Sequence, residues 1–354
     1  MRWVACVLTL LAVPAAAQSP TSTFRWHVEG VGGLSLFDLP TGGESALPRA
    51  GAPLTTSGPI NPSRRVSTWF LGDGSNLLNG VNAEFGVSGR IASLDSALTS
   101  LGLSGNNASA VGLRIRRVLS GRLALELSAD MLPGSRTVSP ELTTAVETAR
   151  ASFVTAFSSL LSTGPFTNTS VAATTLVANP SSRDLATTVA AQWTIGTRSF
   201  SPYVTLGAGL VHRVGELPSL TLTGTYRFNI LGSVPISETD ILRLRYEQGT
   251  ALAGVVGVGV RRTLSDRLGF SFDGRLLLGQ QTLALLLDSE PAVTTGTPEG
   301  FIESFTTPAI QFSNNRTTGR ESSLSGPPLT GFKAFSTTGL QTRYVITAGL
   351  FVKF

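Results

Sequence analysis

The chain has 354 residues, a formal net charge of +5, 38 glycines and a single cysteine. Its basic residues are scattered singly rather than clustered, which argues against a nucleic-acid partner, and one cysteine excludes a disulfide framework. No cofactor or metal site is predicted, because the two histidines are far apart and no further cysteines are present.

The first residues read as a secretory signal peptide, predicted to span residues 1–17. Met1, Arg2 and Trp3 precede an apolar run that is too short to span a bilayer as a helix, and small residues at Ala15 and Ala17 suit a cleavage site. Cys6 lies within this segment, so the mature chain, residues 18–354, is predicted to form one domain without cysteine.

Eight segments alternate apolar and polar residues with a period of two, the pattern of half-buried strands. Each is long enough for a tilted strand to cross a bilayer, which takes about nine to eleven residues. The predicted strands are residues 25–37, 108–118, 122–131, 184–195, 201–213, 250–262, 267–279 and 340–354.

The connections between these segments alternate strictly between short and long. Residues 119–122, 196–200 and 263–266 have the length and composition of hairpin turns, whereas the other connections are far longer. This alternation predicts an all-β fold, a transmembrane antiparallel up-and-down β-barrel with short periplasmic turns and long extracellular loops.

Two further segments affect the strand number. Residues 219–230 alternate well and residues 300–312 weakly, so ten strands are possible, although eight are predicted. In the eight-strand interpretation, residues 219–230 extend the fifth strand and pair with residues 241–248 as a hairpin above the bilayer.

One helix is predicted in the second long loop. Ser139 can cap it, Pro140 suits its first position and Gly164 can end it. We expect this helix to cover the barrel mouth or lie on the membrane surface, with partner binding as the alternative.

The strand faces separate cleanly into apolar outward positions and polar inward positions. The inward positions, where Gln192 and Tyr203 also lie, are predicted to form a charge network that comprises Glu29, Arg114, Arg116, Glu126, Asp130, Asp273, Arg275 and Arg343. Such a network could mark a catalytic or conducting site. Because an eight-stranded barrel has room only for side chains, we expect internal ion pairs instead.

Catalytic constellations are scarce, and no enzyme is predicted. His212 with Glu216 or Asp240 is the one combination that could supply an acid and a base at the outer rim. The segment Gly72 to Asn76 has oxygen ligands near glycines but lacks the remaining ligands of a calcium loop.

The last predicted strand places Tyr344, Ile346, Leu350, Val352 and Phe354 on one apolar face that ends on an aromatic residue. This pattern resembles the C-terminal signal by which bacterial outer-membrane barrels are recognised by their assembly machinery. With strands such as residues 122–131 and 201–210, the mature chain resembles the small outer membrane protein A-like barrel group.

The resemblance implies export to the outer membrane of a Gram-negative-type bacterium. Its implied partners are outer-membrane lipids and lipopolysaccharide, with the barrel-assembly machinery during biogenesis, and the implied state is a monomer. We expect a structural, adhesive or surface-binding role carried by the long loops. The alternatives are a narrow porin-like channel for small solutes and, less favoured, an outer-rim lipid-modifying enzyme or protease.

Overall fold

The computed structural model describes most of the chain beyond the predicted signal peptide. The described residues are 25–40, 42–49, 51, 64–105, 108–133, 136–195, 200–230, 236–294, 304–306, 310–313 and 322–354.

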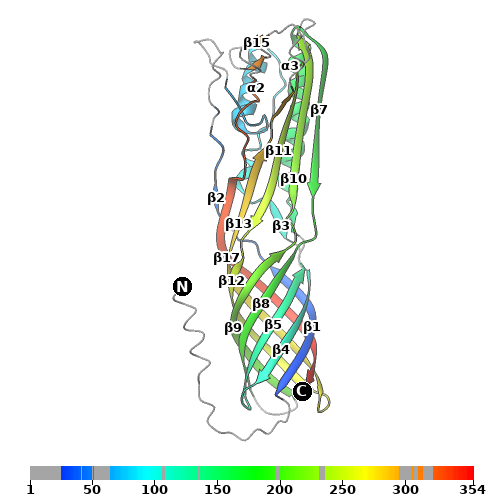
Figure 1. The fold of residues 1–354 in the computed structure, drawn as a ribbon, viewed down its shortest axis with the longest axis vertical. Coiled ribbons are helices and arrows are strands. Elements are labelled where there is room, and N and C mark those ends of the chain that lie inside the picture. Colours follow the sequence, from blue (N-terminus) through cyan, green and yellow to red (C-terminus); the bar gives the residue numbers. More distant parts are fainter. Residues whose placement is uncertain are drawn as a thin grey trace.

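Eight antiparallel strands form a ring in which every strand is hydrogen-bonded to two ring neighbours (Figure 1). Its order is β1-β4-β5-β8-β9-β12-β13-β17, and β17 pairs back onto β1 from Phe37↔Arg343 to His27↔Lys353. These strands are β1 (Trp26–Phe37), β4 (Ala108–Val118), β5 (Leu123–Pro133), β8 (Arg183–Thr194), β9 (Phe200–Val214), β12 (Ala251–Thr263), β13 (Leu268–Ser289) and β17 (Phe332–Lys353).

All eight predicted strands are present in the ring, and six of them end within two residues of the predicted bounds. The exceptions are β13 and β17, which have 22 residues each and continue beyond the ring. The alternation is interrupted at Gln280–Gln281, and the apolar run Leu283–Leu287 that follows has no period of two. The prediction therefore ended β13 too early.

The upper halves of β13 and β17 belong to a second sheet, which we call the extension. At the top of the ring β13 exchanges its neighbour β12 for β11, so that the sheet continues as β17-β13-β11-β10-β7. Its remaining strands are β7 (Phe166–Ala178), β10 (Ser219–Ile230), β11 (Ile236–Gln248), β14 (Ala292–Thr294) beside β11, and β2 (Glu44–Ser45) beside β17.

The predicted hairpin above the ring is present, since β10 pairs with β11 from Ser219↔Arg245 to Phe228↔Ile236. The prediction that residues 219–230 extend the fifth strand is wrong. Gly215 adopts φ +94° after β9, so the chain turns out of the ring before β10 begins.

Within the second weak segment, the described residues form only the short strands β15 (Ser304–Thr306) and β16 (Gln311–Ser313), which pair with each other. Neither joins the ring. The remaining short strands, β3 (Leu103–Gly105) and β6 (Arg136–Val138), likewise pair with each other.

The predicted helix is confirmed as α3 (Pro140–Thr163). Ser139 accepts a hydrogen bond from the Leu142 amide at 3.2 Å, and Pro140 occupies the first turn. The helix does not stand alone, because one face of it packs against the extension sheet (Figure 1).

A second helix, α2 (Gly72–Glu84), was not predicted, and a short 3-10 turn follows at Ala97–Thr99. Leu71 at the N-cap of α2 makes no side-chain cap bond, and glycines fill its first turn, so the usual sequence signals of a helix start are missing. Among the described residues, no helix is both long and apolar enough to cross a bilayer.

The long connections therefore build a folded body rather than separate surface loops. Its core joins α3 to the sheet through Phe153, Phe157 and Tyr226, with the Phe157 and Tyr226 rings stacked at 4.3 Å. Gly224 makes this packing possible, because a Cβ there would lie 2.5 Å from the Phe153 ring. The described residues thus contain one core in the extension and a separate, smaller one inside the ring.

Candidate functional site: the interior of the ring

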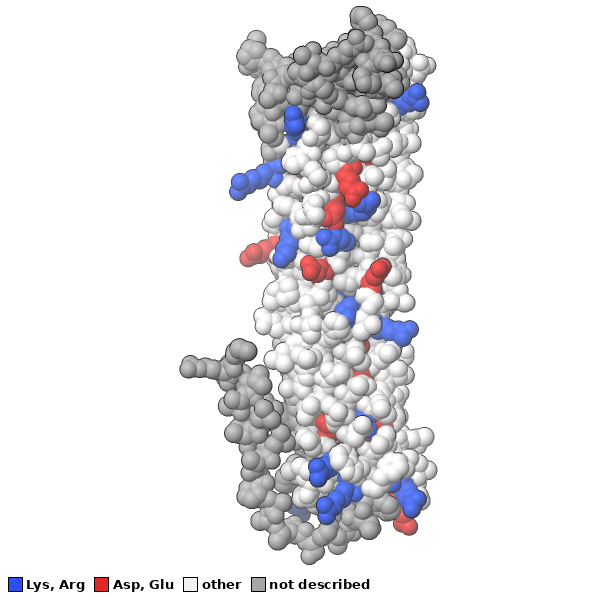
Figure 2. All heavy atoms as spheres, viewed as in Figure 1, with Lys and Arg blue, Asp and Glu red and all other residues white. Residues whose placement is uncertain are grey.

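The outward face of the ring is apolar. On this face, Val111, Leu127, Val189, Leu206 and Val258 are between 50% and 67% exposed. The residues that flank them on each strand point inward and are less exposed. Figure 2 shows that charged side chains on the visible face lie mainly at the lower end of the ring and over the extension. Such an apolar outer face suits contact with lipid.

Asp273 organises the lower part of the ring interior. Its Oδ2 accepts hydrogen bonds from Arg114 Nη1 at 2.6 Å, Arg275 Nη2 at 2.9 Å and the Tyr203 hydroxyl at 3.1 Å, and its Oδ1 accepts one from the Thr347 hydroxyl at 2.7 Å. The Asp273 carboxylate is buried, and charge-assisted bonds from four strands, its own β13 included, compensate its desolvation.

Glu126 is the second centre of this network. It pairs with Arg275 Nη1 at 2.7 Å and Arg261 Nη2 at 3.5 Å, and it accepts a hydrogen bond from Gln192. Arg261 also reaches Glu29 at 3.1 Å. The pairs link strands on opposite sides of the ring, so they brace its cross-section.

The periphery of the network involves the two other predicted members. Arg116 contacts Gln192 at 3.4 Å and His27 Nδ1 at 2.9 Å, while Asp130 lies 3.7 Å from Arg114 Nε. We call the whole set the lower network, which comprises Glu29, Arg114, Arg116, Glu126, Asp130, Arg261, Asp273 and Arg275. It holds four carboxylates and four guanidiniums, so its formal charges cancel.

An apolar layer lies above the lower network. Its side chains are no more than 9% exposed and fill the interior between two charged levels. The layer comprises Ala110, Leu132, Ala186, Val211, Ala251, Ala253, Val255, Leu277 and Val345. An ion in this layer would meet few polar groups, such as the buried Ser35 hydroxyl beside Val345, so the layer disfavours charged solutes.

Arg343 faces the ring interior but does not join the lower network. It pairs with Asp184 above the apolar layer, where Asp184 also meets Arg213 Nε at 2.9 Å and Arg136 Nη2 at 3.7 Å. Gln248 accepts hydrogen bonds from Arg136 and Arg213. We call Arg136, Asp184, Arg213, Gln248 and Arg343 the upper arginine cluster.

Sequence reasoning missed several members of these sets. Arg261, Asp184 and Arg213 lie on the inward parity of strands whose outward residues were assigned correctly, so the alternation alone could have found them. Arg136 lies in β6, beyond the ring strands, and no periodic signal points to it.

The predicted assembly signal lies on the outward face of β17. Tyr344, Ile346, Leu350 and Val352 are between 38% and 63% exposed, as their shared parity requires. Phe354 continues the pairing, since its amide donates to the Trp26 carbonyl at 2.8 Å and its carbonyl accepts from the Trp26 amide at 3.2 Å. Their role in assembly stays a prediction.

No family model matches the chain, and no curated protein matches its sequence. Among solved structures, the chain is similar to the outer membrane protein OprG from Pseudomonas aeruginosa, at 10% identity and a TM-score of 0.38, over 94% of this chain and 98% of that one. It is more weakly similar to the CymD monoaromatic hydrocarbon channel, at 10% identity and a TM-score of 0.21 (94% and 89% covered). It is also similar to the P. putida toluene transporter TodX, at 9% identity and a TM-score of 0.17, over 95% of this chain and 91% of that one.

Likenesses at these TM-scores carry no argument about this chain. Its relation to a membrane follows from its own geometry. An antiparallel ring that is apolar outside and polar inside leaves no unpaired backbone toward lipid. This geometry fits the predicted outer-membrane location and the predicted resemblance to outer-membrane barrels.

The predicted rim constellation is not assembled. His212 is exposed and its Nδ1 contacts the Thr250 hydroxyl at 2.9 Å, and Glu216 is exposed too. Asp240 is instead buried in the extension core, where it accepts hydrogen bonds from Thr68 Oγ1 at 3.0 Å and the Trp69 amide at 2.6 Å. Burial raises the pKa of Asp240 to about 7, and the nearby Glu238 adds to this shift, whereas the hydrogen bonds from Trp69 and Thr68 oppose it.

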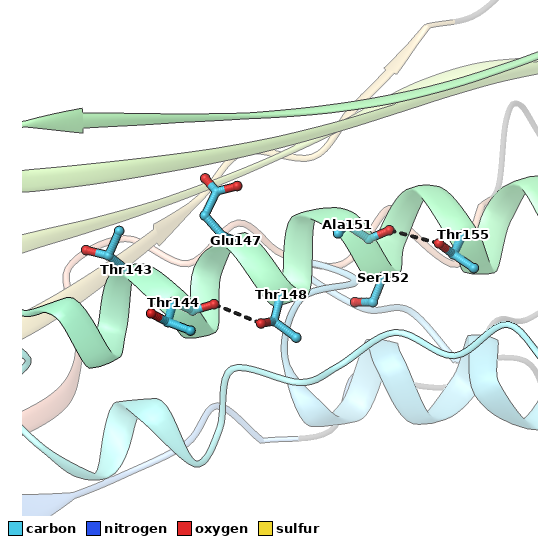
Figure 3. A pocket seen from close by; sticks show the side chains of 7 residues that line it. All are labelled: Thr143, Thr144, Glu147, Thr148, Ala151, Ser152 and Thr155. Atoms are coloured by element: carbon cyan, nitrogen blue, oxygen red, sulfur yellow. Dashed lines mark hydrogen bonds between the residues drawn. The ribbon is translucent and has the colours of Figure 1, made fainter.

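A wide, open depression of about 580 Å³ runs along the outer side of α3 (Figure 3). It is lined by short polar side chains, among them Thr144 and Thr148, which satisfy backbone carbonyls of their own helix. Glu147 at its edge bonds to Thr175 of β7, which, with Arg150, lowers the pKa of that carboxyl. No group here is placed for catalysis, and among the described residues no cluster could hold a metal ion.

Proposed function

We propose that the chain is an integral outer-membrane β-barrel of eight spanning strands. In this proposal the sealed barrel anchors the extension as a rigid platform for surface binding outside the cell. One observation supports it above all: the interior is filled at successive levels by the lower network and the apolar layer, while the larger core lies in the extension.

The filling of the ring supports an anchor. Arg114, Glu126 and Asp273 are each 1% exposed, and Leu132 is fully buried. An eight-stranded barrel has an interior just wide enough for such side chains, and the ion pairs fix the strands to one another.

The packing of the extension supports a platform. Trp69 donates to the Tyr226 hydroxyl at 3.2 Å and its ring meets Phe157 edge-on at 5.7 Å. Aromatic contacts of this kind rigidify a body and hold its outer surface in one shape. The matching partners, lipopolysaccharide and outer-membrane lipids, and the monomeric state remain predictions.

Planar-bilayer recording tests the sealed anchor. The refolded full chain is expected to give no current steps above the lipid background. A variant with a thinned apolar layer, Leu132→Ala with Leu277→Gly, serves as a positive control and should admit ions. Regular current steps from the wild type would contradict the proposal.

Surface binding needs a second test. Cells that display the chain should bind lipopolysaccharide-coated beads more than cells that lack it. The excess should fall when exposed arginines of the extension, Arg227 and Arg243, are replaced by glutamate. Equal capture with and without the protein would argue against a platform for this partner.

The second candidate is a narrow channel for small solutes. It is favoured by buried polar atoms inside the ring that have no hydrogen-bond partner among the described residues, namely Arg116 Nε, Arg261 Nε, Thr205 Oγ1 and Gln341 Nε2. Such atoms are commonly satisfied by water. The bilayer recording separates the two candidates, and solute-driven swelling of protein-containing liposomes extends the comparison to uncharged solutes.

A further inference from the structure

The upper arginine cluster has an excess of buried positive charge. Three guanidiniums meet a single carboxylate, and all four side chains are withdrawn from solvent: Arg136 is 0% exposed, Arg213 7%, Arg343 4% and Asp184 4%. The lower network, by contrast, is neutral. The imbalance is therefore local to the outer end of the ring interior.

The oxygens of Asp184 are already fully shared. Oδ1 faces Arg213 at 2.9 Å, and Oδ2 serves both Arg343 and, at 3.7 Å, Arg136. Among the described residues, no other carboxylate lies within ion-pairing distance of these three guanidiniums. The amide oxygen of Gln248 accepts from Arg136 and Arg213, but it carries no charge.

Several donors at this level have no acceptor. Arg136 Nε is buried without a hydrogen-bond partner, Arg136 Nη2 has only the long contact to Asp184, and Gln341 Nε2 is also unpaired among the described residues. The Phe37 ring lies 5.6 Å from the Arg136 guanidinium carbon and 4.9 Å from that of Arg343. Stacking on an aromatic face offsets part of the cost of burial but satisfies no N–H group.

Burial of uncompensated charge is expensive, so a fold that keeps these arginines together needs a further negative group. Arg136 lies outside the spanning strands, and its burial beside Arg213 lowers its pKa to about 9. A guanidinium presents a planar fork of N–H donors that matches the two oxygens of an oxyanion.

We propose that the upper arginine cluster is a binding site for a small oxyanion of the phosphate or carboxylate class, held at the outer mouth of the ring. Arg136 supplies N–H donors that have no acceptor among the described residues, and Arg213 and Arg343 add positive charge beside them. Asp184 limits the affinity for the oxyanion, because it competes for the same guanidiniums. The site does not depend on whether the barrel conducts, and it stands apart from the platform proposal.

Inorganic phosphate is the probe for the test. The full chain is refolded in a detergent free of phospholipid, so that any response comes from the free anion rather than from a lipid headgroup. Phosphate replaces chloride at constant ionic strength, binding is measured by calorimetry, and the unfolding temperature is read from heat-modifiable gel mobility. We expect saturable binding and a rise of several degrees in the wild type.

Arg136→Gln is expected to weaken phosphate binding at least tenfold. Arg90→Gln, which removes an exposed arginine of the extension, should leave it unchanged. Asp184→Asn should strengthen binding several-fold, because it removes the competing carboxylate. This change of opposite sign keeps the test decisive if Arg136→Gln fails to fold.

The proposal is overturned if phosphate neither binds nor stabilises the wild type. It is equally overturned if Arg136→Gln folds and binds as the wild type does, or if Asp184→Asn folds and binds phosphate no more tightly.

Discussion

Asp273 is the residue on which the lower network depends most. Replacing it with asparagine leaves Arg114 without its shortest charged partner and removes one of the two carboxylates that pair with Arg275. Because removal of one partner leaves a buried charge uncompensated, we expect Asp273→Asn to lower the free energy of unfolding by about 3 kcal/mol.

Urea unfolding in lipid vesicles, followed by loss of the heat-modifiable form on gels, measures this change. Asp266→Asn is the matched control, since Asp266 lies exposed in the turn between β12 and β13 and should unfold like the wild type. Equal midpoints for the two variants would show that the network adds little to stability.

Asp240 should make the stability of the extension depend on pH. Its pKa is raised from 3.8 to about 7 in the folded state, so between these values the folded chain retains a proton that the unfolded chain has lost. Stability contributed by the neutral form is therefore complete at low pH and declines as pH rises toward 7. A shift of this size corresponds to a few kcal/mol.

Thermal unfolding at pH 5 and pH 7.5, followed by the fluorescence of buried Trp69, tests this expectation. Asp240→Asn keeps an oxygen that can accept from Thr68 and Trp69, and it should lose most of the difference between the two pH values. Glu216→Gln, on the exposed surface, should retain the wild-type difference. A pH response that persists unchanged in Asp240→Asn would assign it to another group.

Helix α3 is the element that joins the extension sheet to the rest of the extension core. Phe157 is fully buried and packs between Tyr226 at 4.3 Å and Phe153 at 4.6 Å. Phe157→Ala should cost the extension about 3–5 kcal/mol, the usual range for a large aromatic deleted from a core.

Since the ring has its own apolar layer, it should keep its heat-modifiable mobility while the extension loosens. Limited proteolysis separates these two outcomes. Phe85→Ala is the control, because Phe85 is 44% exposed after α2. Simultaneous loss of both bodies in Phe157→Ala would show that they fold as one unit.

Sequence could predict the elements of the ring but only parts of the body above it, namely helix α3 and the hairpin of β10 and β11. In the ring, lipid and lumen impose alternate faces on every strand, so the period of two in segments such as β4 and β12 specifies both existence and bounds. The charged interior follows from the same parity. Helix α3 also had a local signal, in Ser139 and Pro140.

The extension lacks such a constraint because its sheet is covered on one side by helices and crossing segments. There Leu283–Leu287 of β13 is a continuous apolar run, and β7 mixes apolar and polar residues without a strict period of two. Contacts between segments far apart in the sequence determine where such strands pack in the extension. One example is the hydrogen bond that Asp240 accepts from the amide of Trp69, 171 positions away. Arg136 enters the upper arginine cluster through the same long-range packing.

Across the whole molecule, the pairing of β17 with β1 decides whether the sheet is a closed barrel. Leu34 and Ile346 are direct cross-strand partners, and both are exposed on the outward face. Antiparallel partners have Cα atoms about 4.5–5.5 Å apart, within the range that a disulfide can bridge. In a Cys6→Ser background, cysteines at positions 34 and 346 should therefore cross-link on oxidation, with nearly complete loss of free thiols.

The matched control combines the cysteine at position 34 with one at position 352. Val352 shares the outward face but pairs with Val28, six residues along β17 from Ile346, which is about 20 Å at the rise of a strand. This pair should stay reduced under the same oxidant. Free thiols in the 34/346 variant, or equal cross-linking of both pairs, would mean that β1 and β17 are not held in this register and that the ring is open between its first and last strands.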